Sequence, residues 1–347
     1  METVNFAGND YLGLAKDPRL IEVLNKTARV RGISPTSSRW ALGWTDIHEQ
    51  LEVELADFFG TEGACIMGAA YFGGMAYFEV LGKTRRVVYC DKTSHSNLFY
   101  GMRAAGFAIR CFRHLDAGEC AAIIKKDGPE HSVVATDGVY GISGEIAPIA
   151  ELVRIAQEAD AEMLVDDAHG VFALGAAGRG SPELCGINPE TITIIGSMSK
   201  ALGCTGGFLA GREELVERFR RAQGPSGSAI PPAPIAAACL EALRIVRREP
   251  ELREKMFSHA ERMREALKKR GIGVVSDKTP IVAMSFADEF EAAAAAEHFL
   301  KHGLRIPYFK YASEPRENML RAAARACYTE EQLQRFETAV DSLKLGG

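Results

Sequence analysis

A single lysine stands in a stretch of small, uncharged residues, GSMSKALGCTGG (196–207). Lys200 follows TITIIGS, an apolar run with the composition of a buried strand. Burial at a strand end disfavours the charged form of a lysine, lowers its pKa and makes the amine a nucleophile. Small neighbours let a flat ligand approach the backbone, and Ser197 and Ser199 offer hydroxyls to an anionic group. The alternative is a solvated lysine in a glycine-rich loop.

Two other strand ends carry residues that suit the same ligand. In AEMLVDDAHG (161–170), Asp166 follows an apolar run directly, where an unpaired carboxylate costs several kcal/mol and needs a cationic partner. His169 lies three positions further on, and His95 lies at a strand-to-helix junction in SHSNLFYG. A surface Asp–Asp turn and a helix-capping histidine are the alternatives. Since ligands of doubly wound sheets bind beyond the carboxyl ends of the strands, we expect these residues to share one site.

Together these residues fit pyridoxal 5'-phosphate (PLP). An aldehyde cofactor bound to Lys200 as a Schiff base needs a carboxylate that keeps its ring nitrogen protonated, and Asp166 would supply it. Ala168 and His95 would pack on the two faces of the ring, and His169 would reach the ring hydroxyl. The protonated ring is the electron sink of PLP chemistry. The pattern therefore predicts an enzyme with catalytic residues Lys200, Asp166 and His95.

The elements that position these residues alternate along the chain. Short apolar runs predict strands near 63–67, 86–90, 108–112, 132–136, 162–166, 191–196 and 206–210, with helical patterns near 47–59, 69–82, 95–105, 116–125, 148–159 and 180–186 between them. This alternation predicts an α/β domain with a mostly parallel, seven-stranded sheet. We expect a large domain over 35–235. Residues 1–34 and 236–347 would form a smaller α+β domain, with a helical pattern over 232–270 that is interrupted near Pro250.

Composition excludes several classes of protein. The chain has 347 residues and a formal net charge of −5, which disfavours nucleic acids and anionic membranes as partners. The N-terminal residues lack the charged and apolar regions of a signal peptide, so we expect a cytoplasmic enzyme. The 8 cysteines are scattered without C-x-x-C pairs or nearby histidines, which predicts reduced thiols and no metal site.

In order along the chain, NDYLGLA, SSRWALGWTDIHEQLE, DKTSHSN, LVDDAHGVFALGAAGRG and GSMSKALGCTGGFLAG resemble the motifs of the α-oxoamine synthases. These are PLP-dependent enzymes of fold type I, and the resemblance extends over nearly the whole chain. It implies that Lys200 binds the cofactor covalently and later removes the substrate α-proton. It also implies that Asp166 pairs with the pyridine nitrogen, His169 with the ring oxygen and His95 with the ring face.

The resemblance implies further binding residues. Ser197 would bind the phosphate, together with backbone N–H groups at Ala70 and Tyr71. Ser228, in SAIPPAP, would reach the phosphate of a partner subunit, so that the active enzyme is a homodimer. Asn9 and Arg321 would hold the amino-acid carboxylate, which a guanidinium can bind in a bidentate way.

The implied reaction is the condensation of a small amino acid with an acyl-CoA or another acyl thioester, followed by decarboxylation to an α-aminoketone. The chain departs from the family pattern at Gly141 and Ser143 and around residues 305–325, where the substrates would bind. These departures leave an alternative, a PLP-dependent aminotransferase, decarboxylase or aldolase-type enzyme that acts without CoA. A subunit that binds PLP without turnover is disfavoured by the presence of Lys200, and a nicotinamide dehydrogenase by the lack of G-x-G-x-x-G after an early strand.

Overall fold

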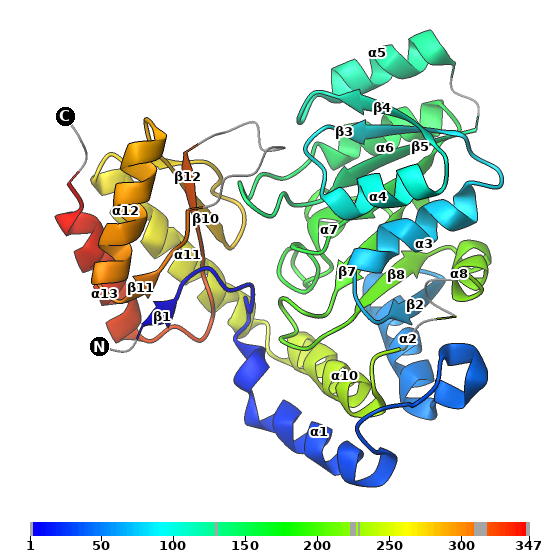
Figure 1. Cartoon of the computed structure of the whole chain (residues 1–347), viewed down its shortest axis with the longest axis horizontal. Coiled ribbons are helices and arrows are strands. Elements are labelled where there is room, and N and C mark those ends of the chain that lie inside the picture. Colours follow the sequence, from blue (N-terminus) through cyan, green and yellow to red (C-terminus); the bar gives the residue numbers. More distant parts are fainter. Residues whose placement is uncertain (1–2, 129–130, 223–226, 228–229, 309–317, 345–347) are drawn as a thin grey trace. The chain divides into compact units, whose positions relative to one another are not determined.

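The computed structural model describes residues 3–128, 131–222, 227, 230–308 and 318–344 (Figure 1). The chain forms two compact units. The large unit comprises Leu14–Val139 and Ile146–Arg248, and the small unit comprises Met1–Gly13, Tyr140–Glu145 and Glu249–Gly347.

The large unit is built on a seven-stranded sheet with the order β2-β8-β7-β6-β5-β3-β4. The strands in this order are Gly63–Met67, Gly207–Gly211, Thr193–Ser197, Glu162–Asp166, Ser132–Asp137, Val87–Asp91 and Ala108–Phe112. Strands β7, β6, β5, β3 and β4 are parallel, and β8 pairs antiparallel with both β7 and β2. Strands β3, β5, β6 and β7 are almost entirely buried, as expected where helices cover both faces of a sheet, whereas the edge strand β4 is largely exposed.

Helices pack on the two faces of this sheet (Figure 1). On one face, α3 (Tyr71–Leu81), α4 (Ser96–Ala104) and α8 (Glu213–Arg220) share a hydrophobic core with the strands. Helices α2 (Asp46–Phe59), α5 (Ala117–Asp127) and α6 (Ile149–Glu158) contact the sheet elsewhere, and α10 (Ala233–Arg248) packs between α2 and α1 (Pro18–Arg31). The large unit also contains four shorter helical segments among its described residues: Leu14–Lys16, Arg39–Gly43, Ser181–Leu184 (α7) and Pro189–Thr191.

The small unit contains a three-stranded antiparallel sheet, β12-β10-β9 (Met319–Ala323, Ile281–Ser285 and Gly273–Val274). Its helices are α11 (Glu251–Lys269), α12 (Glu289–Lys301) and α13 (Glu330–Ser342), which share a core with alternate residues of the strands. A two-stranded parallel sheet joins β1 (Val4–Asn5) to β11 (Leu304–Arg305). The N-terminal residues thus belong to the same unit as the C-terminal third of the chain.

The bounds of the units differ from the expected ones at both ends of the large domain. Residues 14–34 and 236–248 belong to the large unit, because α1 packs on α10 and α10 packs on α2. Residues 140–145 belong to the small unit, where Gly144 O accepts a hydrogen bond from Thr279 Oγ1 at 3.0 Å and Gly141 O accepts one from Arg321.

The structure confirms the expected α/β class and the mostly parallel sheet, with each predicted strand within two residues of an observed one. The pattern over 232–270 forms α10 and α11, which are separated at Pro250. Among the described residues, no helix combines the length and apolar character needed to cross a membrane.

Candidate active site

The sheet register brings the predicted strand-end residues to one edge of the large unit. Asp166 ends β6, and Ser197 ends the neighbouring strand β7. Asp137 ends β5 on the other side of β6, where it is the register partner of Asp166. His95 follows β3 by a short turn, and Lys200 follows β7. These strands are parallel, so their carboxyl ends gather at one edge.

The carboxylate of Asp166 is buried and held by two donors. Only 6% of the residue is exposed. Asn97 Nδ2 donates to Asp166 Oδ2 at 2.9 Å, and the Ala168 N–H donates to Asp166 Oδ1 at 3.2 Å. The carboxylate therefore has a fixed orientation and further acceptor capacity, which suits a protonated ring nitrogen.

Lys200 lies in a tight turn between β7 and β8. The turn is closed by hydrogen bonds from Met198 N to Gly206 O, from Cys204 N to Met198 O and from Gly203 N to Lys200 O, at 3.0, 3.0 and 2.9 Å. Gly203 has φ +65°, and a Cβ there would lie 2.3 Å from the backbone nitrogen of Ala15, so this position requires glycine. The glycine-rich sequence thus builds the turn that carries the half-buried lysine.

Two further carboxyl groups, those of Asp137 and Asp167, are buried near Asp166. Burial, and then the negative charge of Asp166, raises the pKa of Asp137 well above its ordinary value. Burial raises the pKa of Asp167 to about 7, against two hydrogen bonds from Ser181. The positive charge of Lys200 lowers both pKa values, but by less than burial raises them. The sequence analysis missed Asp137, although its position at the polar end of an apolar strand was a usable signal.

His95 occupies the position directly before helix α4 and is anchored through its backbone. Its N–H donates to Asp137 Oδ1 at 3.0 Å, and its Nδ1 lies 2.9 Å from Asn97 Oδ1. The ring is exposed, and the ring of Tyr71 stands edge-on to it, with the centroids 6.0 Å apart. A Cβ on Gly101 would lie only 2.5 Å from the Gly74 carbonyl oxygen, so glycine at 101 lets α3 and α4 pack closely.

Two of the residues expected to bind the phosphate, Ser197 and Ala70, lie next to Gly207 of β8. Gly207 is the register partner of Ser197, and a Cβ on Gly207 would lie 2.3 Å from Ala70 Cα. Ala70 immediately precedes helix α3, so the start of this helix and the Ser197 hydroxyl lie near each other. Ser197 Oγ lies 2.8 Å from Ser199 Oγ. Hydroxyls near a helix N-terminus suit a phosphate.

The remaining cofactor residues are placed as follows. Ala168 and His169 occupy the turn after β6 and are half-buried. Tyr71 is the first residue of α3 and is 41% exposed. Ser228 lies outside the described residues.

Asn9 and Arg321 come together in the small unit. Arg321 lies in β12 opposite Ala283, is only 5% exposed, and uses four of its five N–H groups within this unit. Nε donates to Gly141 O at 3.0 Å, and Nη1 to Ala7 O at 2.7 Å. Nη2 donates to Asn9 Oδ1 at 2.6 Å and to Tyr11 OH at 3.1 Å. The guanidinium is therefore held in one plane, with Asn9 beside it.

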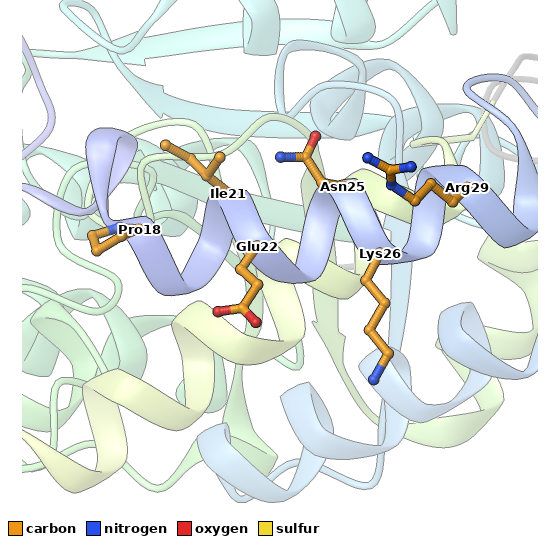
Figure 2. A pocket seen from close by; sticks show the side chains of 6 residues that line it. All are labelled: Pro18, Ile21, Glu22, Asn25, Lys26 and Arg29. Carbon is orange, nitrogen blue, oxygen red and sulfur yellow. The ribbon is translucent and has the colours of Figure 1, made fainter.

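A hollow of about 580 Å³ runs along helix α1 (Figure 2). Its lining residues all belong to this helix: Pro18, Ile21, Glu22, Asn25, Lys26 and Arg29. Figure 2 shows their side chains projecting from the helix, and all six residues are exposed. None of the strand-end residues lines this hollow, so it is separate from the candidate active site.

The strand-end residues fit PLP by the chemistry of their donors and acceptors. The buried Asp166 carboxylate suits a ring nitrogen that carries a proton, and Lys200 suits a carbonyl carbon. Ser197 and the start of α3 suit a phosphate, and the exposed ring of His95 suits stacking on a flat heterocycle.

Comparisons with known proteins agree with this fit. The family model for aminotransferase class I and II matches residues 2–340. The chain is 34% identical over 306 residues to an 8-amino-7-oxononanoate synthase of Methylococcus capsulatus, covering 87% of this chain and 79% of that protein. It is 33% identical over 345 residues to the enzyme of the same name from Thioalkalivibrio sulfidiphilus, covering 98% and 88% of the two chains. A solved serine palmitoyltransferase from S. paucimobilis with bound PLP superposes with a TM-score of 0.92 at 27% identity, covering 98% of this chain and 88% of that one.

The fold and the strand-end residues define a PLP-dependent transferase of fold type I. The chain belongs to the aminotransferase class I and II family and, within it, to the α-oxoamine synthases.

Proposed function

We propose that the chain condenses a small amino acid with an acyl-CoA or another acyl thioester and releases carbon dioxide, which yields an α-aminoketone. The observation that carries this proposal is the gathering of Lys200, Asp166 and His95 at one sheet edge, in a chain similar along nearly its whole length to 8-amino-7-oxononanoate synthases. The proposal includes a catalytic or binding role for each of these side chains.

Bound PLP supplies an electron sink for the pair of electrons left when a bond to the substrate Cα breaks. Asp166 holds the proton on the ring nitrogen, because its carboxylate is buried and fixed by Asn97 and Ala168. Lys200 Nζ would hold the cofactor at its carbonyl carbon and would act as the base for the α-proton of the substrate. His95 packs on the ring and helps to orient the acyl group.

Arg321 and Asn9 orient the substrate carboxylate. Asn9 Oδ1 accepts from Arg321, and Asn9 Nδ2 and the guanidinium both carry N–H groups of the kind that a carboxylate binds. Gly141 contributes its carbonyl to Arg321, and the Ser143 hydroxyl accepts from Glu145 N at 3.3 Å. The serine at 143 therefore supports the local turn through its hydroxyl, whereas any residue at 141 would offer the same carbonyl to Arg321.

The test is an assay of free CoA with purified, PLP-loaded protein. Each of a set of small amino acids is combined with acyl-CoA of different chain lengths. We expect release of CoA and carbon dioxide in equal amounts, only when a matching amino acid is present. Lys200→Ala is the matched control, and it should lose the visible absorbance of the lysine-bound cofactor together with CoA release. Absence of amino-acid-dependent CoA release from every pair would contradict the proposal.

Assays of the same purified protein without acyl-CoA distinguish this function from the alternative that does not use CoA. A transaminase converts PLP to its amine form with an amino donor alone, and a decarboxylase releases carbon dioxide without a thioester. We expect neither in the absence of acyl-CoA, because the relatives that span the chain are synthases. Full conversion to the amine form by an amino acid alone would favour the aminotransferase.

We propose that the active form is a homodimer. Four large side chains at the start of α3 and on α4 are exposed: Tyr71, Phe72, Met75 and Tyr100, at 41, 45, 39 and 53%. The ring of Tyr71 contacts those of Phe72 and Tyr100, so the patch is continuous, as expected of an interface. Mixing a Lys200→Ala chain with a Ser228→Ala chain should restore activity if each site takes residues from both subunits. No recovery in the mixed dimer would contradict shared sites.

A cytoplasmic location is part of the same proposal. All of the cysteines are free thiols, which is the usual state in a reducing compartment. Cell fractionation with detection of the native protein checks this location.

A further inference from the structure

Asn97 connects two residues of the candidate active site. It lies in the first turn of α4 and is 2% exposed. Its Nδ2 donates to Asp166 Oδ2 at 2.9 Å, and its Oδ1 lies 2.9 Å from His95 Nδ1. One amide thus links the turn after β3 to the end of β6. No motif or residue spacing in the sequence predicts this role for Asn97.

The orientation of this amide follows from a third contact. The backbone N–H of Leu98 lies 2.8 Å from Asn97 Oδ1. A backbone N–H only donates, so the atom that it meets is the oxygen of the amide. The NH₂ group consequently faces Asp166, whose carboxylate oxygens accept hydrogen bonds.

This orientation also fixes the tautomer of His95. Since Asn97 Oδ1 only accepts, the 2.9 Å contact requires that His95 Nδ1 carries a proton. In the neutral ring, Nε2 then has the lone pair. A competing contact, from Asn97 N to His95 Nδ1, is longer at 3.4 Å and would need an unprotonated Nδ1, so the shorter contact decides.

The contacts of Asp137, the second carboxyl group at this edge, are compatible with a proton on His95 Nδ1. Asp137 Oδ1 accepts from His95 N at 3.0 Å and so holds the backbone of the turn. Burial and the charge of Asp166 raise the pKa of Asp137, which favours its neutral form. The two polar side chains at this edge thus have different contacts: Asn97 donates to Asp166, and Asp137 accepts from the backbone of the histidine.

We propose that Asn97 is a positioning residue that holds His95 as the Nδ1–H tautomer and fixes the Asp166 carboxylate before the cofactor binds. The inference rests on the proposed roles of His95 and Asp166. It adds that one amide sets the state of both, so that Nε2 of His95 faces the site as an acceptor and Asp166 is already oriented toward the ring nitrogen.

Three variants separate the two contacts. Asn97→Ala removes both the acceptor for His95 and the donor to Asp166. Asn97→Asp keeps an oxygen toward His95 and Leu98 but places a second carboxylate oxygen against Asp166. Ser96→Ala alters the neighbouring, exposed position of the same helix turn and is the matched control. Circular dichroism and thermal unfolding establish that each variant is folded.

The first readout is the tautomer of His95 in cofactor-free protein. Long-range proton–nitrogen NMR spectra report this tautomer, and the signal that disappears in His95→Gln identifies the ring. We expect Nδ1–H in the native protein, in Ser96→Ala and in Asn97→Asp, and a shift toward the Nε2–H form in Asn97→Ala. An Nε2–H ring in the native protein, or an unchanged tautomer in Asn97→Ala, would overturn the inference.

The second readout is the equilibrium dissociation constant of PLP, measured by absorbance titration. We expect weaker binding by about 10- to 100-fold in Asn97→Ala and at least as large a loss in Asn97→Asp, because a hydrogen bond to a buried carboxylate is lost. Ser96→Ala should bind like the native protein. PLP affinity within about twofold of the native value in Asn97→Ala would also overturn the inference. Neither readout uses the condensation reaction, so failure of the proposed function would leave both outcomes unaffected.

Discussion

In the large unit Asp166 is held by the side chain of Asn97 and one backbone N–H, whereas in the small unit Arg321 is held by two backbone carbonyls as well as by Asn9 and Tyr11. The acid lies at the end of a parallel strand, and the arginine lies within an antiparallel one. The difference reflects how each sheet collects residues. Parallel strands gather the ends of successive βα units at one edge, while the small unit joins three distant pieces of chain around one guanidinium.

This comparison predicts different sensitivities. A site held by side chains can be altered one interaction at a time, and the backbone persists. A site held by carbonyls leaves those carbonyls unpaired when the donor is changed. Substitutions with matched controls can therefore test whether the two sites differ in this way.

The largest effect is expected from the pair of carboxyl groups at the ends of β5 and β6. Asp166→Asn should lower kcat/KM by about 10²- to 10³-fold, because it removes the charge that, in the proposed function, keeps the cofactor ring protonated. Asp137→Asn should cost less than about tenfold, since an amide resembles the neutral acid and can still accept from His95 N. Steady-state kinetics with PLP in excess measure both. Equal losses of kcat/KM in the two variants would contradict different roles for Asp166 and Asp137.

The next effect concerns the small unit. Arg321→Lys should raise the KM for the amino acid by about 10- to 100-fold, because an ammonium cannot serve both carbonyls and both side chains in the plane of the fork. Arg325→Lys is the control. Arg325 Nη2 lies 2.7 Å from Asp10 Oδ2, and its guanidinium lies 5.7 Å from the centroid of the Tyr328 ring. A lysine can keep a charged contact with Asp10 and with the ring face. A KM that rises equally in both variants would argue against a specific carboxylate site at Arg321.

The sequence predicted the large unit better than the small one for a physical reason. Apolar runs that end in polar residues mark buried parallel strands, and the positions of Asp166 and Ser197 follow from that pattern alone. Lys200 followed from its conspicuous position after such a run.

What the sequence did not predict depends on packing between distant segments. An amphipathic pattern shows that a helix buries one face but not its partner, and so α1 and α10 were expected in the small domain. Residues 140–145 join the small unit through contacts with Thr279 and Arg321, which no local pattern encodes. Asn97 was missed because its importance comes from Asp166, 69 positions away in the chain.

A smaller effect tests the buried acid next to Asp166. The folded-state pKa of Asp167 is about 7, above the ordinary value for aspartate, so its contribution to the free energy of unfolding is lost as pH rises from about 4 through 7. Ser181 Oγ donates to Asp167 Oδ1 at 2.6 Å and Ser181 N to Oδ2 at 2.9 Å, which favours the ionised form.

Ser181→Ala should therefore destabilise the protein more at pH 8.5 than at pH 5. The expected cost is about 1.5–3 kcal/mol where the carboxylate is ionised and about 0.5–1.5 kcal/mol where it is protonated. Urea unfolding of cofactor-free protein at both pH values gives the difference, in which other titrating groups cancel. An equal cost at both pH values would contradict a raised pKa at Asp167.

The smallest contrast concerns backbone strain near each site. Phe172, in the segment after β6, has φ +67°, and Asn318, just before β12, has φ +62°. Asparagine tolerates this region, whereas a bulky residue does not. Phe172 is fully buried among Phe58, Phe59 and Phe208, with centroid distances of 5.6, 5.5 and 5.8 Å, so aromatic packing offsets the strain.

Replacing Phe172 by alanine removes the packing and keeps the strain, while replacing it by glycine removes both. Phe172→Gly should therefore be about 1 kcal/mol more stable than Phe172→Ala, the reverse of the usual order for these residues. Asn318→Ala and Asn318→Gly should follow the same order, because their φ values are similar. Urea unfolding of the cofactor-free variants measures each pair. If the alanine variant is the more stable one at 172 but not at 318, the prediction fails for Phe172. The segment after β6 then relaxes to negative φ once the ring is removed. In that case the packing of the phenylalanine ring imposes the positive φ, and the turn itself does not require it.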